Sequence, residues 1–299
     1  MTLRIGTSEA GGTFYSQGAA LAELFNRNRT DKEKCVVEPT LASIDNAERL
    51  DRGEIEFGFM PFNWIGCAKD GTAPFAKKIA LRMVSPANAG PIFFVTLAGS
   101  PIKSVGDFIG RRIALGPRGG GMARHAEGIF KILGIPFASL TPAYLSFADG
   151  AEALIQGEID AQFQPPIPNR VMTHLSERAD VRVVPYAAGQ LEKILSGVSF
   201  YRKVAMEKGS FRGVAEEIPQ VGVVNVIVTH EKVREEMVRD LAKTIAENLD
   251  ALPKMNPLFK GLRDLFEPLR AKGPAAFEFG GVPLHPGALR AYREAGWVR

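Results

Sequence analysis

Apolar and polar positions near the amino terminus follow two periods, one typical of strands and the other of helices. A loop of small residues at 8–12 separates the first strand from the first helix, which Thr13 can cap. The pattern predicts strands at 3–7, 36–38 and 55–60, and helices from Thr13 to about Phe25 and from Ser43 or Asp45 to Gly53. This order of strands and helices is typical of a parallel sheet covered by helices.

The following part of the chain repeats the same order. Strands are predicted at 91–97, 112–115, 144–146, 159–163 and 182–185, and helices at 122–133 and 148–156, the second closed by Gly157. Residues 221–229 form a β-branched apolar run that suits a buried strand returning to the first part of the fold. Helices over 231–252 and 286–295 complete the predicted elements.

Two segments of the sequence occur twice. Residues 45–61 align with 149–165 without a gap, and residues 4–12 align with 112–120. The separation is too long for a solenoid, in which repeats recur roughly every 20–50 residues. It indicates two similar lobes, and such lobes usually hold a small molecule in the cleft between them.

We therefore expect an α/β protein with two lobes, parallel-rich sheets and a central cleft. Lobe 1 would comprise 1–89 and 215–299, and lobe 2 would comprise 90–214, with hinge crossings near 90 and near 215. The two copies of the repeat would lie in separate sheets, related by a pseudo-twofold axis.

Composition narrows the class of protein. Of the 299 residues, 45% are hydrophobic and 23% are charged, as in folded soluble proteins. The net charge is +4, but the basic residues are scattered, so we expect no nucleic-acid partner. No apolar run reaches the roughly 18–20 residues of a membrane span. The sequence shows no signal peptide, so the protein is either cytoplasmic or a mature domain whose signal peptide has been removed.

Residue types that carry catalysis or bind metals are few and dispersed. The His residues lack metal-ligand spacing, and Cys35 and Cys67 either pair in an oxidising compartment or are two small buried side chains. Asp45 and Asp149 occupy equivalent repeat positions near helix starts, where they fit helix caps or an acid–base pair. Because no nucleophile motif is present, we expect no enzyme activity, no metal and no cofactor.

Two glycine-rich loops, at 8–12 and 116–121, each follow a predicted strand and precede a helix. Such loops bring backbone close to a ligand and direct N–H groups at a negative oxygen. Neither has the spacing of a P-loop or of the dinucleotide fingerprint. Each fits a tight turn or a ligand site, and their matched positions at the ends of parallel strands favour the ligand site. Aromatic residues at 14–15 and 62–64 can wall a pocket or pack in the core.

Several motifs resemble those of one known family. They are Gly11-Gly12-Thr13-Phe14-Tyr15, the stretch from Ser43 to Asn46 with Leu50, Gly53 and Glu54, the segment 104–112, and the ending at 282–288 with 292–296. Together they are similar, over nearly the whole chain, to the TAXI family of solute-binding proteins from tripartite ATP-independent periplasmic (TRAP) transporters. The resemblance implies a type II periplasmic binding protein fold, in which two α/β lobes close on a small solute.

The resemblance also implies a function and a set of site residues. It implies a periplasmic, monomeric receptor that delivers a small organic anion or amino acid, typically a carboxylate, to the membrane permease of a TRAP transporter. Carried over by position, the ligand-binding residues of the first lobe are Gly12, Thr13, Phe14, Tyr15, Ser43, Asn46, Met60 and Phe62. Those of the second lobe are Arg118, Gly119, Gly120, Gly121, Met122 and Gln164.

The chain departs from the family pattern in two places. Residues 118–121 lack the hydroxyl donors that the family usually carries, so Arg118 or backbone N–H groups would replace them. Residues 60–63 replace a more polar stretch, which suits a more apolar and less charged solute. Two other functions stay open, an enzyme on the same two-lobed scaffold and a receptor that presents its ligand to a sensor kinase.

Overall fold

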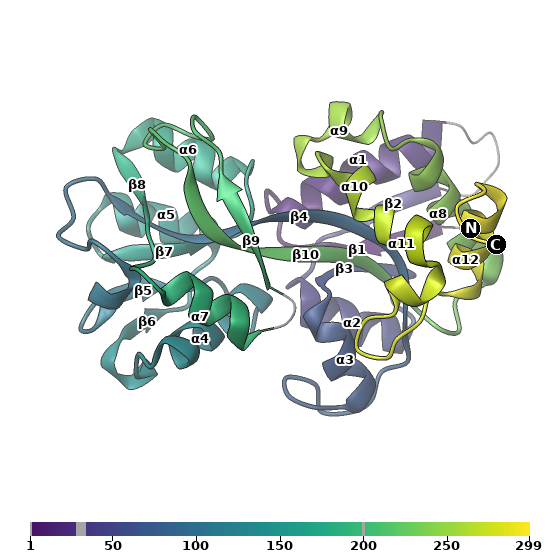
Figure 1. Cartoon of the computed structure of the whole chain (residues 1–299), viewed down its shortest axis with the longest axis horizontal. Helices are drawn as coiled ribbons and strands as arrows, with labels where there is room; N and C mark the ends of the chain where they lie inside the picture. Colours follow the sequence, from purple (N-terminus) through teal and green to yellow (C-terminus); the bar gives the residue numbers. More distant parts are fainter. Residues whose placement is uncertain (1, 28–33, 199–200) are drawn as a thin grey trace. The chain divides into compact units, whose positions relative to one another are not determined.

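The computed structural model describes residues 2–27, 34–198 and 201–299, and Figure 1 labels its helices and strands. The chain divides into two compact units. Unit 1 comprises Met1–Ala10, Phe14–Ala89 and Val224–Arg299, and unit 2 comprises Gly90–Val223 together with Gly11–Thr13. Apart from residues 11–13, the chain passes from unit 1 to unit 2 at Ala89–Gly90 and returns at Val223–Val224.

Unit 1 is built on three parallel strands and the parts of two longer strands. These are β1 (Thr2–Gly6), β2 (Lys34–Glu38), β3 (Phe57–Pro61), the first part of β4 (Leu81–Leu97) and the last part of β10 (Ile218–His230). Strand β1 pairs in parallel with both β2 and β3, and β10 pairs antiparallel with β3. Because β1, β2 and β3 run the same way, their carboxyl ends lie at one edge of the sheet.

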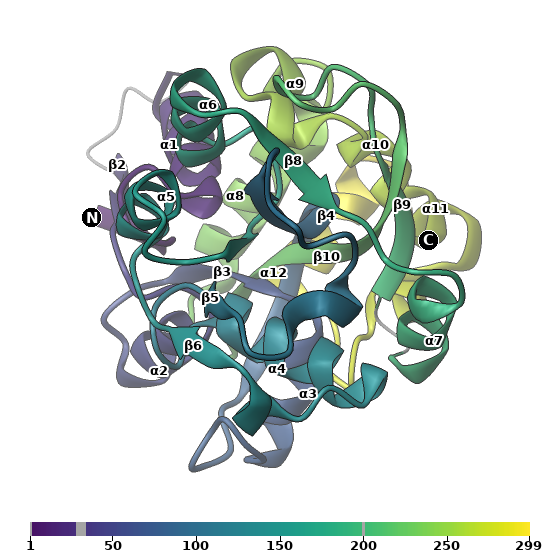
Figure 2. The same ribbon diagram turned by 90° about the vertical axis from the view of Figure 1, so that its left-hand side faces the viewer.

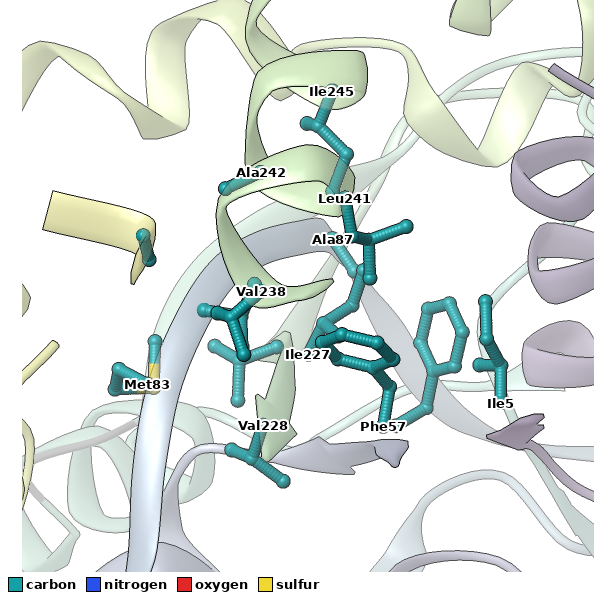
Figure 3. Packing of buried hydrophobic residues seen from close by; sticks show 14 of the residues in the cluster. Ile5, Phe57, Met83, Ala87, Ile227, Val228, Val238, Leu241, Ala242 and Ile245 are labelled. Carbon is teal, nitrogen blue, oxygen red and sulfur yellow. The ribbon is translucent and has the colours of Figure 1, made fainter. Parts of the chain in front are cut away.

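The helices of unit 1 enclose one hydrophobic core. They are α1 (Thr13–Arg27), α2 (Ser43–Arg52), α3 (Asn63–Asp70), α8 (Glu235–Glu247), α9 (Leu252–Met255), α10 (Leu262–Leu265), α11 (Glu267–Lys272) and α12 (Pro286–Glu294), with 3-10 turns at Pro257–Phe259 and Pro274–Phe277. Figure 3 shows Phe57 of β3 and Ile227 of β10 beneath Leu241 of α8, and all three side chains are fully buried. Burial of such side chains stabilises the fold by about 1.5–3 kcal/mol each.

Unit 2 has a sheet with a core on each face, and Figure 2 turns its elements toward the viewer. Its elements are the rest of β4 and β10, β5 (Arg112–Ala114), β6 (Thr141–Ala143), β7 (Ala161–Gln164), β8 (Val181–Val184), β9 (Tyr201–Met206), α4 (Gly121–Leu133), α5 (Phe147–Ile155), α6 (Arg170–Arg178) and α7 (Gln190–Gly197), with 3-10 turns at Val105–Phe108 and Phe137–Ser139. Strand β5 pairs in parallel with β6 and β7, β4 pairs antiparallel with β7 and β8, and β10 pairs antiparallel with β9. Successive residues of β4 face opposite cores, since Phe94 packs with Phe130 and Phe163 whereas Phe93 joins the cluster of Met172.

The sequence repeat corresponds to the same local structure in each unit. In unit 1, the backbone N–H of Arg4 donates to the Glu56 carboxylate over 2.7 Å, and its guanidinium pairs with the same carboxylate at 3.1 Å. In unit 2, the N–H of Arg112 donates to the Asp160 carboxylate over 2.7 Å, and its guanidinium pairs with that carboxylate at 3.0 Å. The aligned segments therefore build equivalent strand–helix–strand motifs.

The expectation that the two repeats occupy separate sheets is wrong. Strands β4 and β10 are neighbours, and the strand order reads β2-β1-β3-β10-β4-β7-β5-β6. The physical reason is the length of the crossing strands, because β4 begins at Leu81 although the pattern predicts it only over 91–97. Strand β6 ends at Ala143, just before its predicted range of 144–146, and the pattern did not indicate α3, α6, α7 or β9.

Helices α8 and α12 of unit 1 pack so closely that one position tolerates no side chain. A Cβ added at Gly287 would lie 2.2 Å from the backbone oxygen of Glu235 and 2.8 Å from the backbone nitrogen of Arg239. Both atoms belong to backbone, so one of the helices would have to move. At Gly128 in α4, by contrast, an added Cβ meets open space.

We predict that Gly287→Ala lowers the free energy of unfolding by about 1–3 kcal/mol, as overpacking does in cores. The matched variant Gly128→Ala should raise it by about 0.5–1 kcal/mol, because alanine restricts the unfolded helix segment. Urea unfolding followed by circular dichroism measures both. Equal stability of Gly287→Ala and the parent would show that α8 and α12 do not approach this closely.

Candidate functional site

The carboxyl ends of β1, β2 and β3 form the edge of unit 1 at which the predicted first-lobe residues lie. The segments 7–12 and 39–42 lead from β1 and β2 into α1 and α2, and Phe62 leads from β3 into α3. The first N–H groups of a helix have no acceptor within it, and the helix dipole adds a partial positive charge there. This edge therefore favours a negatively charged group.

The Asn46 side chain ties β3 to the loops that follow β1 and β2. Its amide nitrogen donates to the carbonyl oxygens of Thr7, over 2.9 Å, and Phe59, over 2.8 Å. Its carbonyl oxygen accepts from the Thr40 hydroxyl at 2.7 Å. Asn46 is fully buried, so these bonds are made without competition from water. The predicted ligand residue Asn46 thus has its amide hydrogens engaged by the protein's own backbone.

At aligned positions of the two repeats, an amide side chain packs against a glycine, but the helix and the strand supply opposite members of the pair. In unit 1, the amide belongs to helix α2, and a Cβ on Gly58 of β3 would lie 3.0 Å from the Asn46 Cβ. The aligned residues in unit 2 are Gly150 of α5 and Gln162 of β7. A Cβ on Gly150 would lie 2.6 Å from the Gln162 amide nitrogen. An amide therefore lies against a glycine in both units, but helix and strand have exchanged the two roles.

The turn into α2 contains a strained residue. Ala42 has φ 67° and ψ −159°, a region populated almost only by glycine, and it directly precedes Ser43. Strain of this kind costs about 1–3 kcal/mol and occurs preferentially at functional sites. Because alanine has no polar side chain, it leaves the first N–H groups of α2 without a side-chain cap. Leu41, just before it, is 69% exposed.

The other predicted residues of unit 1 fall into two groups. Phe14 and Met60 are buried in the hydrophobic core, where the Phe14 ring stacks on Phe59 at 5.4 Å between centroids. Gly12, Tyr15 and Phe62 are half-buried, whereas Thr13 and Ser43 are buried at the first positions of α1 and α2. Thr13 and Ser43 thus stand at helix starts, whereas Phe14 belongs to the hydrophobic core.

The corresponding edge of unit 2 presents the amino terminus of α4. Gly116 ends the strand segment with φ 88°, and an added Cβ would lie 3.0 Å from the Phe147 ring, so glycine is required there. Helices α5 and α6 are capped by their own side chains, since Ser146 accepts from the Asp149 N–H and Asn169 accepts from the Met172 N–H. Helix α4 follows Gly120, which has no side chain to cap it. The N–H groups over Gly121 and Met122 are therefore available to an anion.

Arg118 lies in the loop between β5 and α4. Its side chain is exposed, and its guanidinium carbon lies 4.0 Å from the centroid of the Tyr144 ring. A guanidinium over an aromatic face is stabilised by about 0.5–1 kcal/mol at an exposed site. The stacking holds the cation at the end of β6, beside the start of α4.

Gln164, the last residue of β7, belongs to a chain of amide hydrogen bonds. Its amide nitrogen donates to the Gln162 side-chain oxygen over 2.8 Å. The Gln162 amide nitrogen donates in turn to the Phe147 carbonyl oxygen over 2.8 Å. Both glutamines are buried. The structure therefore places Gln164 at the edge with its amide nitrogen engaged by Gln162.

Burial shifts the pKa of the His125 and Cys35 side chains. His125 is buried and bonds Tyr201 at 2.8 Å, and burial lowers its pKa to about 4. Cys35 and Cys67 are free thiols, and burial raises the pKa of Cys35 to about 12. Within the same described ranges, no three His, Cys, Asp or Glu side chains gather as metal ligands would.

A cavity of about 410 Å³ lies in unit 1, away from the predicted residues. Its walls come from the end of α2, the start of β3, the end of β10 and the start of α8. His230 lines it, 3.7 Å from the Asp51 carboxylate. Because it is lined by the residues before β3, this cavity lies at the sheet edge opposite the carboxyl ends.

Sequence reasoning missed three residues that shape the two edges. Thr40 is the second residue after β2, near the strand end at which parallel sheets commonly carry site residues. Tyr144 was predicted to lie in a strand, but β6 ends at Ala143, so Tyr144 lies in the following loop with its ring against Arg118. Gln162 is a polar residue within a buried strand, and that alone was a signal of a buried hydrogen-bond network.

Comparison with solved structures identifies the fold. The chain is similar to MatC from Rhodopseudomonas palustris with bound malate, with TM-score 0.59 and 15% identity over 99% of this chain and 97% of that chain. It is also similar to the periplasmic aliphatic sulphonate binding protein SsuA from Escherichia coli, with TM-score 0.53 and 18% identity over 99% and 93%. A putative L-cystine ABC transporter from Listeria monocytogenes gives TM-score 0.53 and 14% identity over 87% and 96%. These likenesses confirm the expected two-lobed α/β fold of periplasmic binding proteins.

Two further findings place the chain in a family. Across the helices that the structure describes, none combines the length and apolar character needed to cross a membrane. A model of the NMT1-like family matches residues 5–296, nearly the entire sequence. The chain therefore belongs to the NMT1-like family.

Proposed function

We propose that this protein is the solute-binding receptor of a transport system, acting outside the cytoplasm. The observation that carries the proposal is the pair of equivalent edges, one in each unit. In each, parallel strands end at helices whose first turn lacks a side-chain cap, α2 after Ala42 and α4 after Gly120. Such helix starts bind an anion through backbone N–H groups and the helix dipole, without a catalytic side chain. Membership of the NMT1-like family and the fold shared with binding proteins support this function.

The solute that fits these edges best is a small carboxylate. The N–H groups at the start of α4 and the guanidinium of Arg118 are donors on unit 2. Ser43 stands at the start of α2 in unit 1, and Thr13 stands at the start of α1. At either edge, a carboxylate can accept several hydrogen bonds at once. Relatives of similar fold are described with malate and as binding sulphonate, which are also anions.

The delivery partner that we propose is a TRAP permease in the membrane. The proposal rests on the resemblance of residues 11–15, 43–54 and 282–296 to the TAXI family. The receptor would act as a periplasmic monomer and release its solute to the permease. An enzyme on the same scaffold is a weaker candidate, because His125 is buried and its pKa is lowered to about 4.

We predict that Arg118→Ala weakens binding of the carboxylate that binds most tightly by about ten- to hundredfold. A charge-assisted contact contributes about 1.5–3 kcal/mol, and each 1.4 kcal/mol is about tenfold in affinity. Thr13→Val should weaken it by a similar factor through loss of a donor at the start of α1. Titration calorimetry measures both, after a thermal-shift screen of carboxylates has identified the solute.

Two variants serve as controls for this measurement. Arg124→Ala removes an arginine that pairs with Glu127 on α4, and Thr141→Val removes an exposed threonine. Neither should change affinity more than about twofold. If Thr13→Val and Arg118→Ala bind as tightly as the parent, the proposed site is wrong. If only Thr13→Val loses affinity, Arg118 contributes nothing beyond its stacking on Tyr144.

We also predict that the protein leaves its solute chemically unchanged. Within the described residues no side chains gather as metal ligands, and burial raises the pKa of the Cys35 thiol, which disfavours its nucleophilic thiolate form. Mass spectrometry of the solute after prolonged incubation with the protein tests this prediction. Conversion that scales with protein concentration would favour the enzyme on this scaffold over the receptor.

A further inference from the structure

The edge of unit 2 contains a hydrogen-bond acceptor that the described part of the chain leaves without a donor. Gln164 is fully buried, and its side-chain oxygen has no hydrogen-bond partner among residues 2–27, 34–198 and 201–299. A buried polar atom without a partner costs about 1–3 kcal/mol. A group outside the described chain is therefore needed to satisfy this oxygen.

The orientation of the Gln164 amide is fixed by its neighbours. The Phe147 carbonyl oxygen can only accept, so the Gln162 amide must direct its nitrogen toward Phe147. The Gln162 oxygen then faces Gln164, whose nitrogen must donate to it. The atom of Gln164 that remains is therefore the oxygen, which can accept but cannot donate.

The loop that follows β7 cannot supply the missing donor. Three of its first four residues, Pro165, Pro166 and Pro168, have no backbone N–H. The Asn169 amide nitrogen is directed at the carbonyl oxygens of Pro165, at 3.4 Å, and Pro166, at 3.2 Å. This part of the edge presents acceptors, in contrast to the N–H groups at the start of α4.

The internal repeat shows that the fold does not require an amide at this position. Gln164 aligns with Met60 of unit 1, which is also the residue before a proline near the end of its strand. Met60 is fully buried in the core of unit 1. An apolar side chain of nearly the same length therefore suits the equivalent place in this fold.

The proposed N–H and guanidinium donors follow strand β5, and the acceptor Gln164 ends the neighbouring strand β7. Strands β5 and β7 are paired with Ala114 opposite Gln162, so Gly116 and Gln164 each lie two residues beyond that pair. Neighbouring strands are about 4.8 Å apart, which is the scale of one small solute. The loop from Gly116 leads to the donors at Arg118 and α4.

We infer that the solute carries an N–H or O–H donor close to its carboxylate, and that the Gln164 side-chain oxygen accepts a hydrogen bond from it. The inference rests on the proposed function and makes it more specific. The carboxylate binds the donors of the α4 start, and the hydroxyl or ammonium group binds Gln164. The solute is thus a hydroxy acid or an amino acid, and a simple mono- or dicarboxylate lacks one of the two contacts.

Matched solutes test the inference. Titration calorimetry compares succinate with malate and aspartate, glutarate with 2-hydroxyglutarate and glutamate, and propionate with lactate and alanine. In at least one series, the parent should bind a donor-bearing acid about ten- to hundredfold tighter than the plain acid, since a site built to bond a polar group discriminates against analogues that lack it. Equal affinity within every series would overturn the inference.

Substitutions then assign the preference to Gln164. Gln164→Met should bring the affinities for donor-bearing and plain acids to within about threefold of each other and leave the affinity for the plain acid nearly unchanged. Gln164→Leu, a second apolar replacement, should lose the preference in the same way and serves if the methionine variant fails to fold. Gln156→Leu, at an exposed glutamine after α5, is the matched control. A preference that persists in Gln164→Met would show that a buried water, and not the solute, satisfies this oxygen.

The outcomes separate the inference from the proposed function. If no acid in the three series binds the parent, the carboxylate receptor fails and the inference fails with it. If plain and donor-bearing acids bind equally, the receptor stands and only the role of Gln164 is rejected.

Discussion

The geometry of the unit 1 edge depends on one buried amide. Asn46 bonds the backbone just after β1 and in the middle of β3, and it meets Thr40 in the loop after β2. A single side chain thereby links β3 to the loops that enter α1 and α2. Without it, the buried carbonyl oxygens of Thr7 and Phe59 would each lose a donor, although the Thr40 hydroxyl also donates to Thr7. Hydrogen bonds are directional, so they define these loops more sharply than apolar packing does.

Donors and acceptors are distributed unevenly along the unit 2 edge, which would make the proposed site specific. Helix α4 begins with glycines, so its first N–H groups face outward without a cap, whereas α5 and α6 are closed by Ser146 and Asn169. The prolines after β7 remove N–H groups from the other end of the edge. A pocket of uniform polarity would accept any anion of suitable size. One with separate donor and acceptor regions also selects how the solute is oriented.

The order of strands and helices could be predicted from sequence because each has its own period and end signals. Gly53, for instance, ends α2 as predicted, and its conformation there is left-handed. The full length of β4 could not be predicted, because Pro86, Asn88 and Gly90 interrupt its apolar pattern. For the site, sequence placed Thr13 and Ser43 at helix starts, where the structure has them. It could not show that Asn46 is engaged by backbone or that Met60 packs in the core, because both depend on pairing across strands.

The amide and the glycine occupy exchanged positions in the two repeats, and this limits which substitutions each repeat tolerates there. In unit 1 the helix supplies the amide and the strand the glycine, and in unit 2 the reverse holds. A mutation that copied one residue from the other repeat would leave either two amides in the same space or two glycines facing a void. Each intermediate would be less stable than both ends of the path. Converting one arrangement into the other therefore requires paired or compensated substitutions, because the two positions are energetically coupled.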